Sequence, residues 1–435
     1  MVHILDLPNE ILLMIIKKLD NIDVLYSLFG INNERLDILL QEDVFTNTLN
    51  FVRTSSITDN KLDRFYTYIL PRFHHCIKKL VLETISMERI LLAGDYPNLT
   101  SLELFNFDQE QISHFRDDSA VRHIFQYQIT DLILHNNDEY ISEMRLDTYT
   151  KNGELHNLKC FSLTSYNVTL NYDELVIPLL RRMTHLEKLT LYLRSRSRST
   201  FIDGTHLQNE IFVHMPQLHT FIFYISTETM LSDSFPRQSN DDIQRTFTNI
   251  KYGQTACIID YFSGFNVICH VYSLPFAFTR LEKITNGFPT IVFNNVTRLY
   301  AYDVIPMNHE FFMRIGQAFP VLKLFTIQTD AKCTWEPDEL GFDETSSYSV
   351  IEYSHLTSLD IANTNIDCVV QFLHERSIHL PRLTELKINY HELKTVTMNF
   401  TRDETRRNCS KVERLVLFQA PTVVSKEVYE YFSLL

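Results

Sequence analysis

A short apolar pattern recurs along most of the chain, and it limits what these 435 residues can fold into more than any other feature. The pattern is apolar-x-x-apolar-x-apolar, as in Leu186, Leu189 and Leu191. Its copies begin at Ile77, Leu99, Ile129, Leu158, Leu186, Leu218, Val296, Leu322, Leu356, Leu383 and Val412. Their starts lie 22 to 34 residues apart, except for one interval of 78 residues after Leu218. Eleven copies near one spacing indicate a repeat architecture.

Each copy has the alternation of a short strand. Its two apolar residues at positions i and i+2 would face a shared core, and the residues between them would face solvent. Helical spacing appears in several of the segments that lead to the next copy, at residues 62–70, 311–315 and 366–373. Residues 48–51 are predicted to form an earlier strand of the same kind. The sequence therefore predicts an α/β fold in which parallel strands alternate with helices.

The pattern resembles the leucine-rich repeat, whose strand motif it matches most closely. Of the Asn or Cys that this family places beyond the strand, only Asn137 stands in position. The resemblance implies a divergent solenoid over residues 46–425, with a parallel sheet on the inner arc and helices outside, and then a tail at 426–435. Residues 226–290 are irregular. Two β-rich runs there, 256–259 and 267–272, fit either two degenerate repeats or a hairpin.

The N-terminal segment is different, because it is predicted to be helical. Residues 7–19 read Leu-Pro-Asn-Glu-Ile-Leu-Leu-Met-Ile-Ile-Lys-Lys-Leu. Pro8 suits the first turn of a helix, and Glu10 complements the positive end of its dipole. Asp23 is predicted to cap a second helix that Gly30 closes, and a third helix is expected at 34–40. Three helices in about forty residues cannot bury this much Ile and Leu among themselves, so a partner is expected.

This run resembles an F-box, whose helices open with Leu-Pro-x-Glu-Ile-Leu, and the predicted domain covers residues 1–45. Its third helix departs from the family pattern, since residues 31–36 contain no Trp. The resemblance implies docking on a Skp-family adaptor and, through it, on a cullin ubiquitin ligase. The adaptor-binding residues that it implies are Leu7, Pro8, Glu10, Ile11, Leu12, Ile15, Leu19, Val24 and Leu25.

An alternative is that these helices cap the first repeat of an interaction scaffold that has no link to ubiquitin. The two interpretations differ in the burial of the apolar residues of the first helix. A cap would bury Ile11, Leu12 and Ile15 against the strand at 48–51, whereas an F-box would leave part of this apolar stripe exposed.

Composition excludes several classes of function. A net charge of −14 disfavours nucleic-acid binding, and nine glycines disfavour phosphate-binding loops. No apolar run approaches a membrane span, and no signal-peptide pattern is present, so no membrane partner is expected. Seven scattered cysteines are typical of reduced thiols. We expect a protein of the cytoplasm, the nucleus or both.

Catalytic and metal-binding motifs are missing from the sequence, so we predict a non-enzymatic receptor with no cofactor, no metal and no catalytic residue. Its protein target is not identified by the sequence. If the apolar pair of each strand points inward, the neighbouring residues face solvent, and Tyr and Arg are typical of binding hot spots. The predicted target-binding residues are Tyr192, Tyr224, Arg298, Tyr300 and Tyr302. The alternative is that strands simply favour tyrosine.

Overall fold

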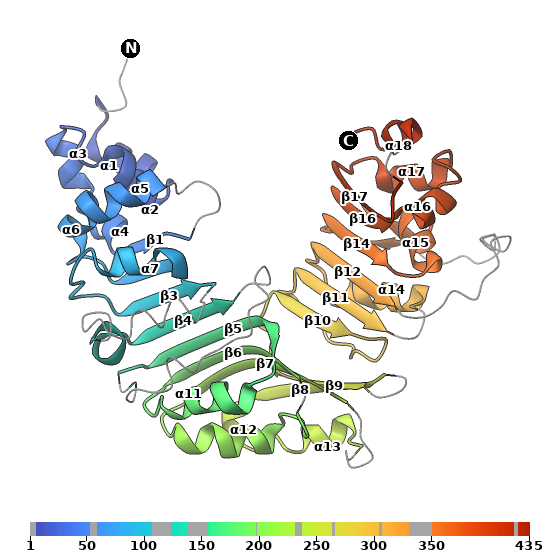
Figure 1. Cartoon of the computed structure of the whole chain (residues 1–435), viewed down its shortest axis with the longest axis horizontal. Coiled ribbons are helices and arrows are strands. Elements are labelled where there is room, and N and C mark those ends of the chain that lie inside the picture. The colour runs from blue at the N-terminus through green and yellow to red at the C-terminus, as the bar shows by residue number, and fades with distance from the viewer. Residues whose placement is uncertain are drawn as a thin grey trace. The chain divides into compact units, whose positions relative to one another are not determined.

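The computed structural model describes residues 6–52, 59–106, 123–136, 155, 157–196, 198–230, 237–262, 266–303, 307–329, 350–421 and 425–435. The chain divides into two compact units (Figure 1). Unit 1 comprises Met1–Thr229 and Asp241–Thr255, and unit 2 comprises Met230–Asn240 and Ala256–Leu435.

Unit 1 begins with helices and continues with strands that alternate with short helical segments. In chain order its elements are α1 (Asn9–Ile16), α2 (Asn21–Leu28), α3 (Glu34–Leu39), α4 (Asp43–Thr46), β1 (Thr48–Asn50), α5 (Asp59–Arg64), η2 (Phe65–Ile69), α6 (Leu70–Phe73), β2 (Lys79–Glu83), α7 (Thr84–Leu91), β3 (Ser101–Phe105), η4 (Ile124–Gln128), β4 (Asp131–Asn136), β5 (Cys160–Thr169), η5 (Tyr172–Val176), α11 (Ile177–Arg181), β6 (Lys188–Arg196), α12 (Gly204–Glu210), η6 (Phe212–His214), β7 (Thr220–Met230), α13 (Asn240–Gln244) and η7 (Ile250–Tyr252).

Strands β1 to β7 lie side by side in chain order, and each is parallel to the next. The predicted apolar pattern sets their register. One row across the sheet is Leu49, Leu80, Leu102, Leu132, Phe161, Leu189 and Phe221, all of them buried. A second buried row runs from Leu82 to Phe223. The same two positions of every strand therefore build the core on one face of the sheet.

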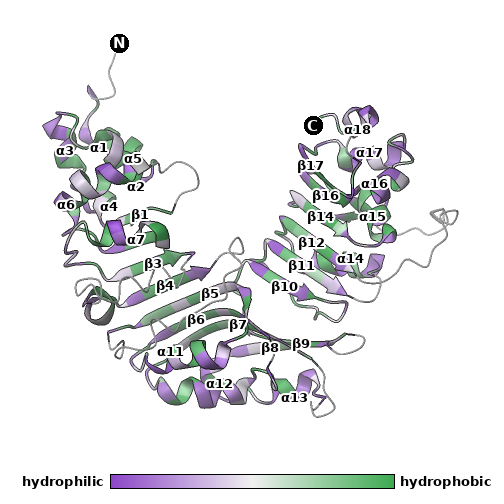
Figure 2. Ribbon diagram, viewed as in Figure 1, coloured by the Kyte–Doolittle hydropathy of each residue, from purple (hydrophilic) through white to green (hydrophobic). Residues whose placement is uncertain are grey.

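Unit 2 repeats this plan with a second parallel sheet. Its elements are β8 (Gln254–Tyr261), β9 (Asn266–Leu274), β10 (Arg280–Ile284), β11 (Arg298–Asp303), α14 (His309–Ala318), β12 (Leu324–Thr329), β13 (Ile351–Glu352), β14 (Ser358–Asn363), α15 (Ile366–Leu373), β15 (Ile378–His379), β16 (Glu385–Asn389), α16 (Tyr390–Val396), α17 (Asp403–Cys409), β17 (Arg414–Phe418) and α18 (Lys426–Tyr431). The sheet order is β10-β11-β12-β14-β16-β17, and β13 pairs with β15 separately. Figure 2 shows hydrophobic residues recurring in strand after strand of both units.

The predicted α/β class with parallel sheets is confirmed, and all eleven copies of the pattern form strands. The irregular interval contains a hairpin. Strands β8 and β9 are neighbours, and the amide of Phe262 donates a 2.8 Å hydrogen bond to the carbonyl of Asn266. A connection this short joins antiparallel strands. The interval also contains β10, a parallel strand that the pattern did not predict.

Candidate functional site

Helix α1 is apolar on two opposite sides, and only one side is covered. Leu12 and Ile16 lie one turn apart and are buried in the unit. Ile11, Met14 and Ile15 point the other way, with exposed fractions of 43%, 67% and 40%. A helix that is apolar all round is normally buried all round. The outer side of α1 therefore lacks the cover that its composition calls for.

Helix α2 anchors this segment to the rest of unit 1. It begins one residue after Asp20, whose side chain accepts a 3.0 Å hydrogen bond from the amide of Ile22. The prediction that Asp23 is the cap was therefore wrong, because the helix starts earlier. At its end Phe29 packs edge-on against Phe73 of α6, with ring centroids 4.7 Å apart. Gly30 follows with a positive φ of 75°, as a helix-closing glycine should.

Arg35 of α3 fixes the third helix against the start of α1. Its guanidinium donates to Asn9 Oδ1 at 2.6 Å and to the carbonyl of Leu7. Ile38 lies one turn further along α3 and is 68% exposed. Leu19, just beyond α1, is also exposed. We call the set Ile11, Met14, Ile15, Leu19 and Ile38 the N-terminal apolar surface.

The predicted adaptor-binding residues separate into two groups. Ile11, Ile15 and Leu19 lie on the N-terminal apolar surface, Pro8 and Glu10 are exposed beside it, and Leu7 is half-buried. Leu12, Val24 and Leu25 are in the core instead, so they support the surface and do not form it. Helical spacing would have identified Met14, which lies three residues after Ile11. Ile38 lay in the helix where the sequence departs from the family pattern.

The predicted target-binding residues of unit 1 are not exposed, which corrects the sequence prediction. Tyr192 and Tyr224 stand opposite each other on β6 and β7 and are completely buried. The cause is a bulge in β5 between Thr164 and Val168. It brings Tyr166 against Tyr192, with ring centroids 5.0 Å apart. These tyrosines form a row of packed rings and not an open binding face.

The predicted residues of unit 2 share one face of β11. Arg298 is exposed, and Tyr300 and Tyr302 are half-buried. The Tyr300 hydroxyl donates to Gln328 Oε1 at 2.6 Å, and Tyr302 packs against Phe262 with ring centroids 5.3 Å apart. This face therefore remains available to a partner, mainly through Arg298.

An ion-pair network that the sequence did not predict lies on the open face of the unit 1 sheet. Lys79 Nζ is 2.7 Å from Glu103 Oε2, and His135 Nε2 is 3.2 Å from Glu103 Oε1. The contact with His135, together with the hydrogen bond and charge of Lys79, lowers the pKa of Glu103 to about 2. The carboxylate is thus held charged by two neighbouring strands.

The part of the chain that the structure describes contains neither a candidate metal site nor a helix that could span a membrane. No group of three or more His, Cys, Asp or Glu side chains there has the arrangement of a metal site. Among these same residues, no helix combines the length and apolar character that crossing a bilayer requires.

Similarity to known proteins is found only among solved structures. None of the known protein-family models matches the chain, and none of the curated proteins does. Eleven chains of solved structures match. One of them belongs to the crystal structure of the Rad7 and Elc1 complex in yeast, with 13% sequence identity and a TM-score of 0.29. The match covers 96% of this chain and 90% of that chain. A likeness at this score carries no argument about fold or function.

Proposed function

We propose that this protein is the substrate-recognition subunit of a Skp–cullin–F-box ubiquitin ligase of the cytoplasm or nucleus. Residues 1–45 would be its F-box, and the strands and helices that follow would be a leucine-rich-repeat-like array that binds a protein target. The chain itself makes and breaks no bond. It would hold the target beside the ubiquitin-charged enzyme and so raise the effective concentration of the reacting groups.

The observation that supports this proposal is the exposure of the N-terminal apolar surface. Ile11, Ile15 and Leu19 project from the segment that resembles an F-box, while Leu12 beside them is buried. Large exposed aliphatic groups gathered on one segment are typical of protein-interaction sites. The adaptor is the partner that the family resemblance assigns to these positions.

The alternative function, a repeat scaffold with no link to ubiquitin, predicts a different fate for the same residues. As a cap, Ile11, Leu12 and Ile15 would pack against Leu49 and Phe51 and lose contact with water. Leu12 is buried, but Ile11 and Ile15 are exposed, although Leu49 and Phe51 are both buried. The capping interpretation therefore leaves the outer side of α1 unexplained.

A binding assay with purified full-length protein and a Skp-family adaptor tests the proposal. The double variant Ile15→Asp/Leu19→Asp places two charges on the N-terminal apolar surface without touching the core, and should weaken binding about a hundredfold or more. Val213→Asp is the matched control, since Val213 is also an exposed aliphatic residue of unit 1. If the folded wild-type protein does not bind the adaptor, the repeat scaffold is the function that remains.

A further inference from the structure

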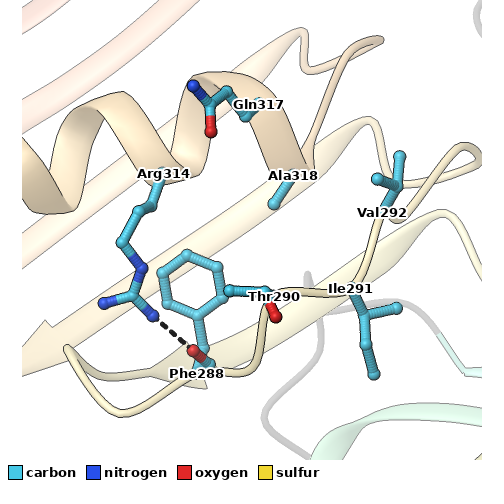
Figure 3. A pocket seen from close by; sticks show the side chains of 7 residues that line it. All are labelled: Phe288, Thr290, Ile291, Val292, Arg314, Gln317 and Ala318. Atoms are coloured by element: carbon cyan, nitrogen blue, oxygen red, sulfur yellow. Dashed lines mark hydrogen bonds between the residues drawn. The ribbon is translucent and has the colours of Figure 1, made fainter.

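A small apolar pocket lies in unit 2 between α14 and the segment that follows β10. Its lining comes from Phe288, Thr290, Ile291, Val292, Arg314, Gln317 and Ala318, and its volume is about 130 Å³ (Figure 3). An apolar cavity of about 150 Å³ can hold a benzene molecule. This pocket therefore has room for one branched aliphatic side chain.

The pocket is held open by buried residues on both sides of the loop. Phe288 is anchored between Phe311 and Phe319, with ring centroids 5.8 Å and 6.1 Å away. Phe293 stacks on Phe319 at 4.9 Å, and its amide donates to the carbonyl of Ala318. The loop is thus anchored at both ends, and between the anchors Val292 is 55% exposed at the rim.

Arg314 places a positive charge at the edge of the pocket. Its guanidinium lies 4.6 Å from the centroid of the Phe288 ring and donates to the carbonyl of Phe288 (Figure 3). It also donates to the carbonyl of Asn286. A guanidinium has five N–H donors, so three remain. Among the described residues no carboxylate lies within ion-pair distance of it, and Glu310 one turn earlier is not paired with it. The charge is therefore available to an anion from outside the chain.

We propose that this pocket binds the C-terminal residue of a partner polypeptide, with a large aliphatic side chain in the pocket and its free carboxylate on Arg314. The guanidinium packs on the ring that lines the pocket, so the apolar group and the anion of the ligand must be close together. In an extended peptide, neighbouring side chains point to opposite sides. An acidic residue beside an aliphatic one would thus turn its carboxylate away. A terminal residue carries both groups on one Cα.

This inference stands apart from adaptor binding. The pocket belongs to unit 2, and none of its lining residues lies in the N-terminal helices. A result on one site does not decide the other. If the proposed ligase function is correct, the pocket would select targets by their chain ends, and if that function fails the pocket would still bind such an end.

The test uses the full-length protein and a ten-residue peptide that ends in leucine with a free carboxylate. Saturation-transfer NMR compares the binding of this peptide with that of two controls. One is the same peptide with an amidated end, and the other ends in serine. The amidated peptide should bind about tenfold more weakly, because it loses a charged hydrogen-bond acceptor. The serine peptide should lose a similar factor through its missing methyl groups.

Two substitutions at exposed positions test the location without disturbing the fold. Gln317→Glu supplies a carboxylate that competes for Arg314, and Val292→Asp puts a charge on the apolar rim; each should weaken the leucine peptide about tenfold. Gln217→Glu and Val213→Asp repeat the same chemistry on exposed residues of unit 1 and should change nothing. Equal binding of the acid and amide peptides, binding that survives both pocket variants, or no binding at millimolar peptide would each overturn the proposal. So would N-acetylleucine binding as tightly as the peptide, since the occupant would then be a small molecule.

Discussion

Arg35 and Asn9 join the third helix of this protein to the first, through a 2.6 Å hydrogen bond from the Arg35 guanidinium to Asn9 Oδ1. The same guanidinium also donates to the carbonyl of Leu7, so one side chain holds the start of α1. Replacing it with Ala should weaken adaptor binding about tenfold, because a charged hydrogen bond contributes roughly 1.5–3 kcal/mol. The melting temperature should fall by a few degrees as well, since the same bonds join α3 to α1 in the folded protein. Calorimetry measures the affinity of this variant for the adaptor. An affinity equal to that of the wild-type protein would show that adaptor binding does not depend on the hydrogen bonds of Arg35.

Leu19 and Leu25 are a matched pair for separating binding from stability. Leu25 is completely buried, whereas Leu19 is 56% exposed. Leu25→Ala should lower the free energy of unfolding by about 3 kcal/mol, as deletions in a packed core do. Leu19→Ala should leave it within about 0.5 kcal/mol of wild type and should weaken the adaptor complex. Urea denaturation and a binding assay on both variants check this, and equal stability losses would contradict the assigned burial.

Asp260 gives unit 2 a stability that should fall as the pH rises. Burial, together with the nearby charge of Asp303, raises the pKa of Asp260 to about 6. In the unfolded chain this carboxyl loses its proton near pH 4, so the folded state binds the extra proton between about pH 4 and pH 6. Its destabilising effect therefore builds up across that window and is complete above it.

Asp260→Asn should stabilise unit 2 at pH 7 by about 2 kcal/mol, since it removes the cost of a buried charge. At pH 4 the two proteins should be equally stable. Urea denaturation at both pH values measures the difference. If the variant gained the same free energy of unfolding at pH 4 as at pH 7, the gain would come from packing and not from the ionisation of Asp260.

Glu103 should have the opposite effect in unit 1. Its pKa is lowered to about 2 by His135 and Lys79, so its contribution is present above the unfolded value near 4.5 and is lost as the pH falls towards 2. Glu103→Gln should cost about 2 kcal/mol at pH 7, which is less than the full shift because solvent still reaches the sheet face. The difference between the variant and wild type should shrink below pH 4.5 and vanish only near pH 2. If the difference in free energy of unfolding between the two proteins stayed constant from pH 7 to pH 3, the ion-pair network would not be the source of the stability.

Tyr192 and Arg298 were both predicted to contact a target, and they should now behave differently. Tyr192→Ala removes a completely buried ring and should lower the free energy of unfolding by about 3–5 kcal/mol. Arg298→Ala should change stability by less than about 0.5 kcal/mol, since the side chain is exposed. Thermal unfolding of both variants decides. A stable Tyr192→Ala protein would mean that the row of rings is open to solvent.

The strands were predictable from the sequence because the pattern that marks them also sets their register. Leu80, Leu102 and Leu132 occupy the same position in three copies and stand beside one another in the sheet. Strand β10 was missed because its two core residues, Leu281 and Ile284, are three apart. A bulge lies between them, and Lys283 adopts a positive φ of 52°. A template with fixed spacing cannot represent that extra residue.

The burial of the tyrosines could not be read from the sequence for a different reason. Alternation along a strand says which residues share a face, but not what covers that face. Tyr192 is covered by Tyr166, which a bulge in the preceding strand carries into place. The apolar stripe of α1 was easier to predict, because it follows from helical spacing alone. Which of its residues face the core depends on how α1 and α3 are joined, and no pattern of residues indicates the bond from Arg35 to Asn9.

The chain-order pairing of β1 to β7 has a consequence for how this part of the protein forms. From β1 to β7 each strand pairs with the one that follows it in this series, so closing each new contact requires a loop of only about one repeat. Assembly can then begin at any strand and spread to its neighbours. A chain emerging from the ribosome could add one strand at a time to a growing edge, without waiting for its distant end.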